Sequence, residues 1–336
     1  MTETLKIVIP MAGLGTRLRP HTWSKPKPLI RIAGQTVLDF IMDLFKTLPD
    51  PDNTEYIFII GHLGEMVKEH IHQCYPHIRA RFIVQEEMLG QSHAIHLARE
   101  VLHGPMIMAF ADTIIQTNFA FLSHEDCDAV AWVRPVPDPR RFGVAKLNSR
   151  NLVERLIEKP SDMTNNLAVV GFYYFAHSED LIAAIEEQMR RKVTLKGEYF
   201  IADAVNILLE KGMTMRTENV DVWLDAGTSE ALLETNRYLL EHGNDNTKEA
   251  SAREGVVVIP PVYIHPSAVV TAAVIGPNVS LGESTTIQNS IVRNSIIEGG
   301  AQVTDSYLEG SLLGRDVIVR GNPTHLNLGD QAWATS

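Results

Sequence analysis

The chain lacks most features of a secreted, membrane-bound or disulfide-stapled protein. Only two cysteines occur, Cys74 and Cys127, in no CxxC pair, which indicates thiols kept in a reducing compartment. No apolar run approaches the roughly 18 residues of a membrane-spanning helix, and residues 1–13 lack the pattern of a signal peptide. The 41 acidic residues outnumber the 30 basic ones, and the net charge of -11 disfavours binding to nucleic acid or anionic lipid. We therefore expect a cytoplasmic protein that binds neither nucleic acid nor membranes.

Familiar catalytic and metal-binding motifs are absent as well. The sequence contains no HExxH or comparable metal-ligand spacing, and no GxSxG turn of an acyl hydrolase. Its 13 histidines include two close pairs, His70 with His72 and His93 with His96, which we interpret as ordinary surface or core side chains. Neither a zinc protease nor a serine hydrolase is indicated.

The first third of the chain alternates β-branched runs with helical periodicity. The expected strands are residues 6–10, 56–60, 81–85 and 106–110, and the expected helices are 37–47, 63–73 and 91–102. This alternation predicts an α/β fold with a Rossmann-like, mostly parallel sheet flanked by helices, in which ligands bind beyond the carboxyl ends of the strands. The loop at 11–27 and Asp112 both fall at such ends.

Further along, the pattern changes twice. Shorter strands interrupted by Pro and Gly are expected from 129 to 175, and three helices follow, which we interpret as an insertion covering one side of the sheet. These helices are expected near 178–191, 199–211 and 229–242. The polar segment HGNDNTKEASARE lacks apolar periodicity and predicts a linker. The predicted division is an α/β domain at 1–241, a linker at 242–254, a second domain at 255–325 and a tail at 326–336.

The second domain carries a repeat of six residues, which is neither the 3.6 of a helix nor the 2 of a strand. Aliphatic side chains recur six positions apart, as in Ile264 and Val270 or Leu313 and Val319. Such hexapeptide repeats predict a parallel β-helix, whose coils stack an aliphatic core and stabilise their neighbours. The repeat resembles that of left-handed β-helices, and the left hand comes from this resemblance, since spacing alone does not determine handedness.

A glycine-rich loop follows the first expected strand. Gly13, Gly15 and Thr16 lie there, and glycines one residue apart let backbone N–H groups approach phosphate oxygens. The loop lacks the Lys-Ser/Thr of a P-loop, and Leu18 stands where a dinucleotide-binding GxGxxG motif needs its third glycine. By itself, a GxG after a strand fits a structural turn equally well.

Basic side chains in the same loop favour a polyphosphate ligand. Arg17, Lys25 and Lys27 lie among prolines that stiffen the loop. Arginine offers a planar fork to two phosphate oxygens, and lysine a movable point charge. In so acidic a chain, three cations beside a glycine cradle predict an anion site rather than a solvated basic loop.

The same loop carries a family signature. Its residues 13–29, GLGTRLRPHTWSKPKPL, resemble the GxGTRxxPxTxxxPKPL signature of sugar-1-phosphate nucleotidylyltransferases, especially the glucose-1-phosphate thymidylyl and uridylyl enzymes. Further matching segments follow in order: QEEMLGQSHAI (85–95), ADTII (111–115), RRFGVAKL (140–147), LIEKP (156–160), LAVVGFYYF (167–175), KGEYFIADAV (196–205) and VWLDAGTSEALLETNRYL (222–239). The hexapeptide tail resembles that of the family's long-form members, which have a C-terminal left-handed β-helix.

This resemblance implies the chemistry. An oxygen of the sugar-1-phosphate would attack the α-phosphorus of the nucleotide in line and expel pyrophosphate, without a protein nucleophile. Arg17 would hold the β- and γ-phosphates, Lys27 the α-phosphate or leaving group, and Lys159 the sugar phosphate. The rest of the nucleotide loop would be Ala12, Gly13, Gly15 and Thr16.

Two carboxylates are implied as metal ligands. Phosphates and the Mg²⁺ they carry need hard oxygen ligands, and the resemblance assigns Asp112 and Asp225, from distant loops, to one Mg²⁺. Each Asp alone is more often a cap or turn former. Ala111 replaces the family's usual Gly and Ala226 its usual Thr; both are small, and we expect little consequence.

The resemblance also assigns the two substrates, a nucleoside triphosphate and a sugar-1-phosphate. Gln85 and Gly90 resemble the residues that recognise a pyrimidine base, because a Gln amide both donates and accepts and Gly leaves room for the ring. This points to dTTP or UTP, which differ at the ring methyl and the 2′-hydroxyl, and to glucose-1-phosphate. A methyl is worth only about 1 to 3 kcal/mol in a pocket, which favours use of both nucleotides. The hexose and its phosphate would contact Gly143, Glu158, Lys159, Val169 and Glu198.

Two other functions stay open. Related β-helices carry coenzyme A-dependent acyl transfer, usually with a histidine on a coil, and the histidines after the linker are His265 and His325. A catalytically silent sugar-nucleotide sensor is the other alternative, which the intact site residues disfavour. We expect the β-helix to serve as a scaffold in a homo-oligomer, so that loss of residues 250–336 alters assembly or stability more than chemistry.

Overall fold

The structure is a computed structural model that describes residues 3–322 and 324–335. Its contacts divide the chain into two compact units: unit 1 comprises 1–13 and 41–223, and unit 2 comprises 14–40 and 224–336. The glycine-rich loop from Leu14 onward therefore belongs to the same compact unit as the C-terminal domain, whereas Gly13 belongs to unit 1. The predicted boundaries at 241 and 254 stay a prediction, because compactness does not show which segments fold independently.

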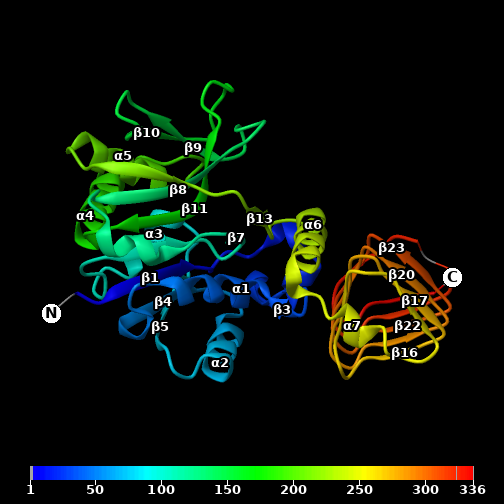
Figure 1. Cartoon of the computed structure of the whole chain (residues 1–336). Helices are drawn as coiled ribbons and strands as arrows, with labels where there is room; N and C mark the ends of the chain where they lie inside the picture. The colour runs from blue at the N-terminus through cyan, green and yellow to red at the C-terminus, as the bar shows by residue number, and fades with distance from the viewer. Residues whose placement is uncertain (1–2, 323, 336) are drawn as a thin grey trace. The chain divides into compact units, whose positions relative to one another are not determined.

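Unit 1 is built on one mixed β-sheet (Figure 1). Its N-terminal part is parallel and contains, in spatial order, β5 (Arg79–Val84), β4 (Thr54–Ile60), β1 (Leu5–Pro10) and β6 (Met106–Ala109). The sheet continues with β11 (Leu167–Phe175), β9 (Gly143–Leu147), β10 (Val153–Glu158), β8 (Ala129–Pro135) and β12 (Met215–Asn219). Strand β11 runs antiparallel to β6, β8 and β9, so the sheet changes direction there. The predicted α/β sheet is confirmed.

The helices of unit 1 begin within two residues of the positions that the sequence predicts. They are α1 (Val37–Leu44, which starts in unit 2), α2 (Gly64–Cys74), α3 (Gln91–Leu97), α4 (Ser178–Arg191) and α5 (Ile201–Glu210). Helix α4 has acidic residues in its first turn and arginines in its last, which complement the helix dipole. It packs on the sheet with α5 through buried residues such as Ile185, Val205 and Tyr173. Helix α3 ends at Leu97, five residues before its expected end at 102.

The C-terminal part of unit 2 is a left-handed parallel β-helix, as the hexapeptide repeat predicts. One sheet contains β14 (Val256–Val258), β17 (Ala273–Ile275), β20 (Ile291–Arg293) and β23 (Tyr307–Glu309). A second contains β15 (Val262–Ile264), β18 (Val279–Leu281), β21 (Ile296–Ile297), β24 (Leu312–Leu313) and β26 (Asn327–Leu328). A third contains β16 (Val269–Thr271), β19 (Thr286–Gln288), β22 (Gln302–Thr304), β25 (Ile318–Arg320) and β27 (Trp333–Thr335).

The repeated aliphatic residues form the core of this β-helix. Ile264, Leu281, Ile297 and Leu313 occupy matching positions in consecutive coils and are buried. The segment 242–254, predicted as a linker, contains the short helix α7 (Thr247–Ala250), and its residue Ala250 lies in the same core. This segment closes the first coil, since Asn246 exchanges two 2.8 Å hydrogen bonds with the backbone of Ile264.

Unit 2 also contains α6 (Ser229–Leu239), which packs on the outer side of the second sheet. There Asn236 accepts a 2.6 Å hydrogen bond from Ser280 of β18. The same Asn236 accepts a 2.9 Å bond from the backbone N–H of Ala33. Ala33 lies between the short strands β2 (Arg31–Ile32) and β3 (Gln35–Thr36), so residues 31–36 are joined to the β-helix through α6. Across residues 3–322 and 324–335, no helix has the length and apolar character needed to cross a membrane.

Candidate active site

The carboxyl ends of the parallel strands meet at one edge of the sheet in unit 1. Ala12 follows β1, Gln85 follows β5, and Asp112 comes three residues after β6. A Cβ at Gly61, directly after β4, would lie 2.6 Å from the carbonyl oxygen of Ala12, so the two loops are in close contact. This is the edge at which open α/β sheets bind ligands, and three of the predicted site residues gather there.

Gln85 is held in one orientation by two acceptors. Its Nε2 donates to the carbonyl oxygen of Gly90 at 3.3 Å and to Nδ1 of His93 at 3.1 Å. A carbonyl only accepts, so the NH₂ group must face Gly90, and Nδ1 of His93 must be unprotonated. Both donor positions of the amide are then in use, and the acceptor oxygen is what Gln85 offers to a ligand. Burial, opposed in part by Glu87, lowers the pKa of His93 and favours this neutral ring.

The segment 198–200 connects the predicted base site with the predicted sugar site. Gly90 has a φ of +103°, and a Cβ there would lie 2.6 Å from both the backbone N and O of Tyr199. Tyr199 also accepts a 3.0 Å backbone bond from Ser92, at the start of α3. On the other side, Nζ of Lys159 lies 4.7 Å from the ring centroid of Phe200. The motifs at 85–95 and 156–160 therefore both contact the motif at 196–205, within its segment 198–200, which includes Glu198.

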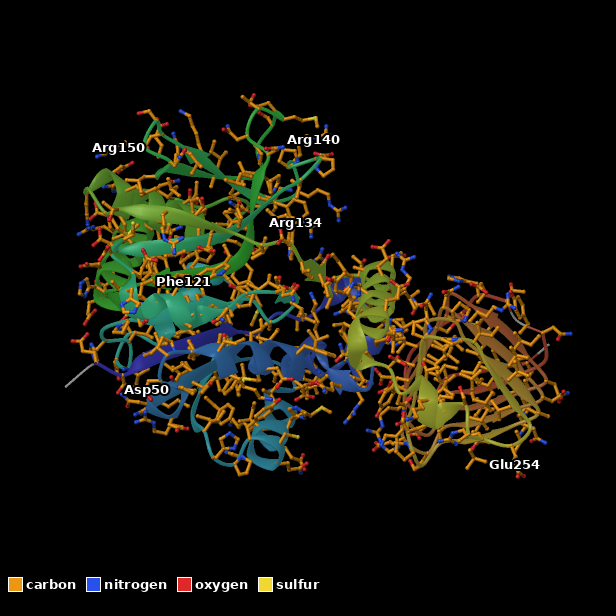
Figure 2. The ribbon with its side chains drawn as sticks, in the orientation of Figure 1. Asp50, Phe121, Arg134, Arg140, Arg150 and Glu254 are labelled. Carbon is orange, nitrogen blue, oxygen red and sulfur yellow. The ribbon has the colours of Figure 1, made fainter. Side chains whose placement is uncertain are left out.

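The predicted hexose pocket is a set of adjacent strands. Gly143 of β9 pairs with Glu158 of β10, and a Cβ at Gly143 would lie 2.9 Å from Oε2 of Glu158. Val144 pairs with Ala168 of β11, which places Val169 next to this hairpin. Arg140 and Arg150 lie in the loops at the two ends of β9 (Figure 2).

The carboxylate of Glu158 is partly buried, and burial disfavours its charged form. Burial raises the pKa of the Glu158 carboxyl, although Lys159, whose Nζ lies 3.7 Å from Oε1, opposes the shift. Burial also raises the pKa of Asp203 nearby. A half-desolvated carboxylate beside an exposed lysine can accept hydrogen bonds from hydroxyl groups while the lysine binds a phosphate.

In unit 2, the glycine-rich loop folds back on itself. Gly15 has a φ of +59°, and a Cβ there would lie 2.9 Å from Cγ2 of Thr22 and 3.3 Å from Cβ of Lys27. The hydroxyl of Thr22 donates to the carbonyl oxygen of Gly15 at 2.9 Å. Only glycine fits this conformation and this space, so the signature glycine brings the backbone next to Lys27. Thr16 follows directly and is exposed.

Arg17 and Asp225 approach a common point in unit 2. A Cβ at Gly227 would lie 2.7 Å from Oδ1 of Asp225 and 3.2 Å from Nη2 of Arg17. Both side chains are exposed, and the Asp225 loop is fixed by the hydroxyl of Thr235, which donates to the Asp225 carbonyl oxygen at 2.8 Å. Because Gly227 has no side chain, the space between the Arg17 guanidinium and the Asp225 carboxylate, here called the Gly227 cradle, is left open. Phosphate oxygens and a hard cation such as Mg²⁺ fit this donor set.

Lys25 does not belong to the anion site. It is only 5% exposed and forms buried ion pairs with Glu298 and, at 3.3 Å, with Asp330 of the β-helix. Its interpretation as a phosphate-facing cation is therefore wrong. The loop's exposed cation near the Gly227 cradle is Arg17, and Lys27 lies against Gly15.

Sequence reasoning missed several residues that shape the site. His93 was interpreted as an ordinary histidine, yet it orients Gln85; its spacing of eight residues from Gln85, across a Gly and into a helix, was the available signal. Tyr199 acts through its backbone, and Gly227 through its lack of a Cβ, so neither has a side-chain pattern to detect. In the part of the chain that the structure describes, no three His, Cys, Asp or Glu side chains cluster as metal ligands.

Comparison with known proteins identifies the class. Residues 6–242 match the nucleotidyl transferase family, and the chain belongs to that family. It is 28% identical over 360 residues to a glucose-1-phosphate thymidylyltransferase of Streptomyces griseus, covering 98% of this chain and 99% of the relative. It is 30% identical over 340 residues to the low-salt glycan biosynthesis nucleotidyltransferase Agl11 of Haloferax volcanii, covering 93% and 92%. A third relative, the bifunctional protein GlmU of Methanococcus vannielii, is 30% identical over 353 residues, covering 96% of this chain and 80% of the relative.

Solved structures support the fold. A UDP-glucose pyrophosphorylase complexed with UDP-glucose superposes with a TM-score of 0.61 at 18% identity, over 71% of this chain and all (100%) of that one. A putative glucose-1-phosphate thymidylyltransferase from Bacillus anthracis gives a TM-score of 0.59 at 23% identity, over 70% of this chain and 94% of that one. The predicted resemblance to sugar-1-phosphate nucleotidylyltransferases with a C-terminal β-helix is confirmed, and the chain is an enzyme of this type.

Proposed function

We propose that the enzyme transfers a nucleotidyl group from UTP or dTTP to a sugar-1-phosphate, with glucose-1-phosphate the preferred acceptor, and releases pyrophosphate. The observation that carries the proposal is the meeting of three motifs at segment 198–200 in unit 1. The residue predicted for the base, Gly90, contacts Tyr199, and the residue predicted for the sugar phosphate, Lys159, lies over Phe200. One short segment therefore lies beside both the residue assigned to the base and the residue assigned to the sugar phosphate, which supports binding of a nucleotide sugar there.

The arrangement around Gln85 supports a uracil or thymine base. Because both amide protons are committed to Gly90 and His93, Gln85 reads a ligand through its acceptor oxygen. Uracil and thymine carry an N3–H donor, whereas N3 of cytosine is an acceptor and would face the oxygen unpaired. A polar site of this kind rejects the wrong partner strongly, because the mismatch leaves a buried group unsatisfied.

The chemistry requires charge neutralisation rather than a protein nucleophile. A phosphate oxygen of the sugar-1-phosphate is already anionic near neutral pH, so it can form the new bond to the α-phosphorus without a general base. The bond from the α-phosphorus to the bridging oxygen breaks, and pyrophosphate leaves with both electrons of that bond. Arg17 and Lys27 are the residues we assign to the triphosphate, and Lys159 to the attacking phosphate.

Asp112 and Asp225 are the residues that would hold Mg²⁺ through carboxylate oxygens. When bound, Mg²⁺ would supply positive charge against the α-phosphate and the departing pyrophosphate. We also propose a cytoplasmic location, supported by Cys74 and Cys127 being thiols rather than a disulfide, and a homo-oligomeric assembly through the β-helix.

Pyrophosphate release from a panel of nucleoside triphosphates and sugar-1-phosphates tests the proposal. We expect release with UTP and dTTP, little with CTP, ATP or GTP, and none without a divalent cation. Tight nucleotide binding without release for any pair would indicate the silent sensor instead. Consumption of acetyl-coenzyme A with an amino-sugar phosphate would indicate an acyltransferase in the β-helix.

A further inference from the structure

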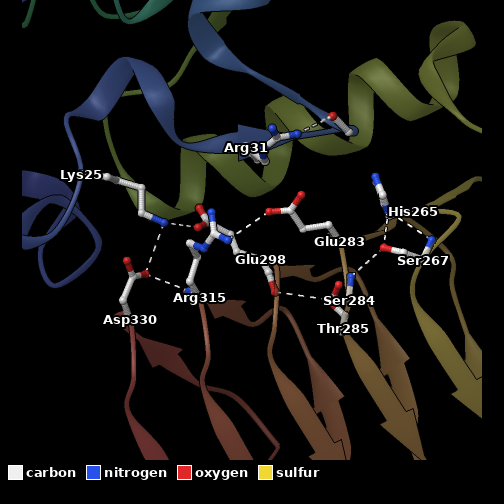
Figure 3. Close-up of polar contacts among 11 residues, drawn as sticks. Lys25, Arg31, His265, Ser267, Glu283, Ser284, Thr285, Glu298, Arg315 and Asp330 are labelled. Carbon is white, nitrogen blue, oxygen red and sulfur yellow. Dashed lines mark hydrogen bonds and ion pairs between the residues drawn. The ribbon is translucent and has the colours of Figure 1, made fainter. Parts of the chain in front are cut away.

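The nucleotide loop is fastened to the β-helix by a buried cluster of charges within unit 2. Lys25 comes from the loop, whereas Glu298 follows β21 and Asp330 follows β26 (Figure 3). Lys25 pairs with Glu298, and its Nζ lies 3.3 Å from Asp330. Lys25 and Glu298 are 5% and 4% exposed, so their pair is interior and not a surface salt bridge, whereas Asp330 is partly exposed.

Neighbouring loop residues are seated on the same coils. The hydroxyl of Ser24 donates to Oδ2 of Asp330 at 2.5 Å, and Nε2 of the buried His21 donates to Oδ1 of Asn327 at 2.7 Å. A Cβ at Gly329 would lie 2.8 Å from Cβ of Pro20, so the coil backbone directly touches the loop. Four residues of the segment 20–25 thus contact the β-helix: Pro20, His21, Ser24 and Lys25. We call Lys25, Glu298 and Asp330 the anchor cluster.

Burying the charges of the anchor cluster costs desolvation free energy, so the cluster is a poor means of stabilising the fold if stability is its only role. Burial by itself would raise the pKa of Asp330, but the Ser24 hydroxyl and the Lys25 ammonium outweigh it and hold that pKa below its usual range. Oε1 of Glu298 is buried and has no hydrogen-bond partner among the described residues. Apolar packing of similar volume often stabilises a protein as well as a buried ion pair does, whereas buried charges fix the register of two surfaces. The cluster is suited to holding the loop in one position.

The segment 20–25, which contacts the β-helix, also contacts the residues that we assign to the triphosphate. Thr22, inside the seated segment, bonds to Gly15, and Gly15 lies against Lys27. Lys27 follows Lys25 after a single residue, Pro26, whose ring restricts the backbone between them. A displacement of Lys25 is therefore transmitted directly to Lys27 and Gly15.

We propose that Glu298 and Asp330 are positioning residues for nucleotidyl transfer: through Lys25, the β-helix holds the nucleotide loop in its working conformation. The kinetic part of this proposal rests on the proposed function, but the structural part does not. The β-helix then takes part in catalysis by support, without touching the substrates.

Glu298→Gln in the full-length enzyme tests the proposal, with Glu283→Gln as the matched control. Glu283 lies in the neighbouring coil close to Glu298, but its exposed carboxylate pairs at 3.0 Å with Arg315, whose backbone N–H donates to Asp330, and not with Lys25. We expect E298Q to lower kcat for pyrophosphate release about tenfold to hundredfold, as displacements near 1 Å do, while E283Q stays near wild type. Amide hydrogen exchange of residues 15–29 should be faster in E298Q only.

A double variant, Lys25→Met with Glu298→Gln, adds a test of pairing. If the two residues act as one unit, the double variant should be no slower than the slower single variant. If E298Q fails to fold, Asp330→Asn carries the same test. The proposed positioning role would be contradicted if E298Q kept the wild-type kcat and the wild-type rate of amide hydrogen exchange. It would also be contradicted by a fall in kcat without faster amide exchange in residues 15–29. Absence of pyrophosphate release from the wild type would instead refute the proposed function. Amide hydrogen exchange in E298Q would still test whether the anchor cluster holds residues 15–29 in place.

Discussion

The residues assigned to substrates are held by different means in the two units. In unit 1, Gln85 and Glu158 sit at the ends of sheet strands, so the hydrogen-bonded ladder fixes their positions. In unit 2, Arg17 and Lys27 lie on single 3₁₀ turns of a loop, which has no ladder of its own. The loop takes its support from the β-helix, mainly at Lys25. Residues of the first kind are suited to choosing the substrate, and residues of the second kind to stabilising charge during transfer.

The largest expected effect is at the carboxylates assigned to Mg²⁺. Replacing Asp112 or Asp225 by Asn keeps the shape but removes the charge, and should lower kcat by roughly 10²-fold or more with little change in thermal unfolding. Asp221→Asn is the control, since this exposed aspartate lies four residues before Asp225 and has no assigned role. Near-normal turnover of either variant would remove that aspartate from the metal site.

An intermediate effect is expected at the base site. His93→Ala frees one amide proton of Gln85, so the amide can turn and offer a donor to cytosine. We expect the preference for UTP over CTP in kcat/KM to fall about tenfold, the size of one hydrogen bond's net contribution. His96→Ala is the control, because His96 lies one turn further along α3 and contacts Glu186 instead. Equal selectivity in both variants would contradict the role of His93.

The same base preference should depend on pH in the wild type. Burial holds the pKa of His93 below its ordinary 6.5, with Glu87 raising it and His96 lowering it, so the ring is neutral at pH 7. As the pH falls through this lowered pKa, Nδ1 gains a proton and repels the amide N–H of Gln85. The UTP preference should therefore be constant above neutral pH and decline only in acid, measured as kcat/KM for UTP and CTP across the pH range. A decline that persists in H93A would exclude His93 as its cause.

The smallest effect is expected at Glu158, where binding and stability oppose each other. Burial raises the folded-state pKa of this carboxyl, so the folded protein favours its protonated form and loses stability as the pH rises through that pKa. Glu158→Gln should increase the free energy of unfolding at neutral pH by about 1 kcal/mol or less and raise KM for the sugar phosphate several-fold. Chemical denaturation and initial rates measure the two effects.

Glu154→Gln is the matched control for this variant. Glu154 lies on the same strand and pairs at 3.0 Å with Lys146 on the surface. Exposed pairs of this kind contribute about 0 to 1 kcal/mol, so neither the stability gain nor the change in KM should appear. A destabilised E158Q enzyme with unchanged KM would show that Glu158 is structural and does not bind the sugar.

Local patterns allowed much of the fold to be predicted. The six-residue spacing of Ile264, Leu281 and their equivalents reflects one coil geometry repeated along the chain, so the β-helix could be read directly. Helix α4 spans Ser178–Arg191 as expected, because its apolar periodicity and charged ends coincide. Helix α3 was overextended, since the apolar residues beyond Leu97 pack into the core from turns instead of a helix.

Long-range partners account for what the sequence could not provide. A lysine in a basic loop looks the same whether it faces phosphate or a buried carboxylate, and the partner of Lys25 is 273 residues away. The expectation that losing residues 250–336 alters assembly or stability more than chemistry stays a prediction, and the anchor proposed above predicts a loss of chemistry as well. The roles of the assigned site residues remain predictions that the variants above can decide.

The central claim is attack on the α-phosphorus of a uridine or thymidine triphosphate. Its most direct test follows two labels in UTP, one at the α-phosphate and one at the γ-phosphate, during reaction with glucose-1-phosphate. The account predicts that the α-label appears in the nucleotide sugar and the γ-label in pyrophosphate, in equal amounts. Release of the γ-label as free phosphate, or no transfer of the α-label to sugar, would contradict it.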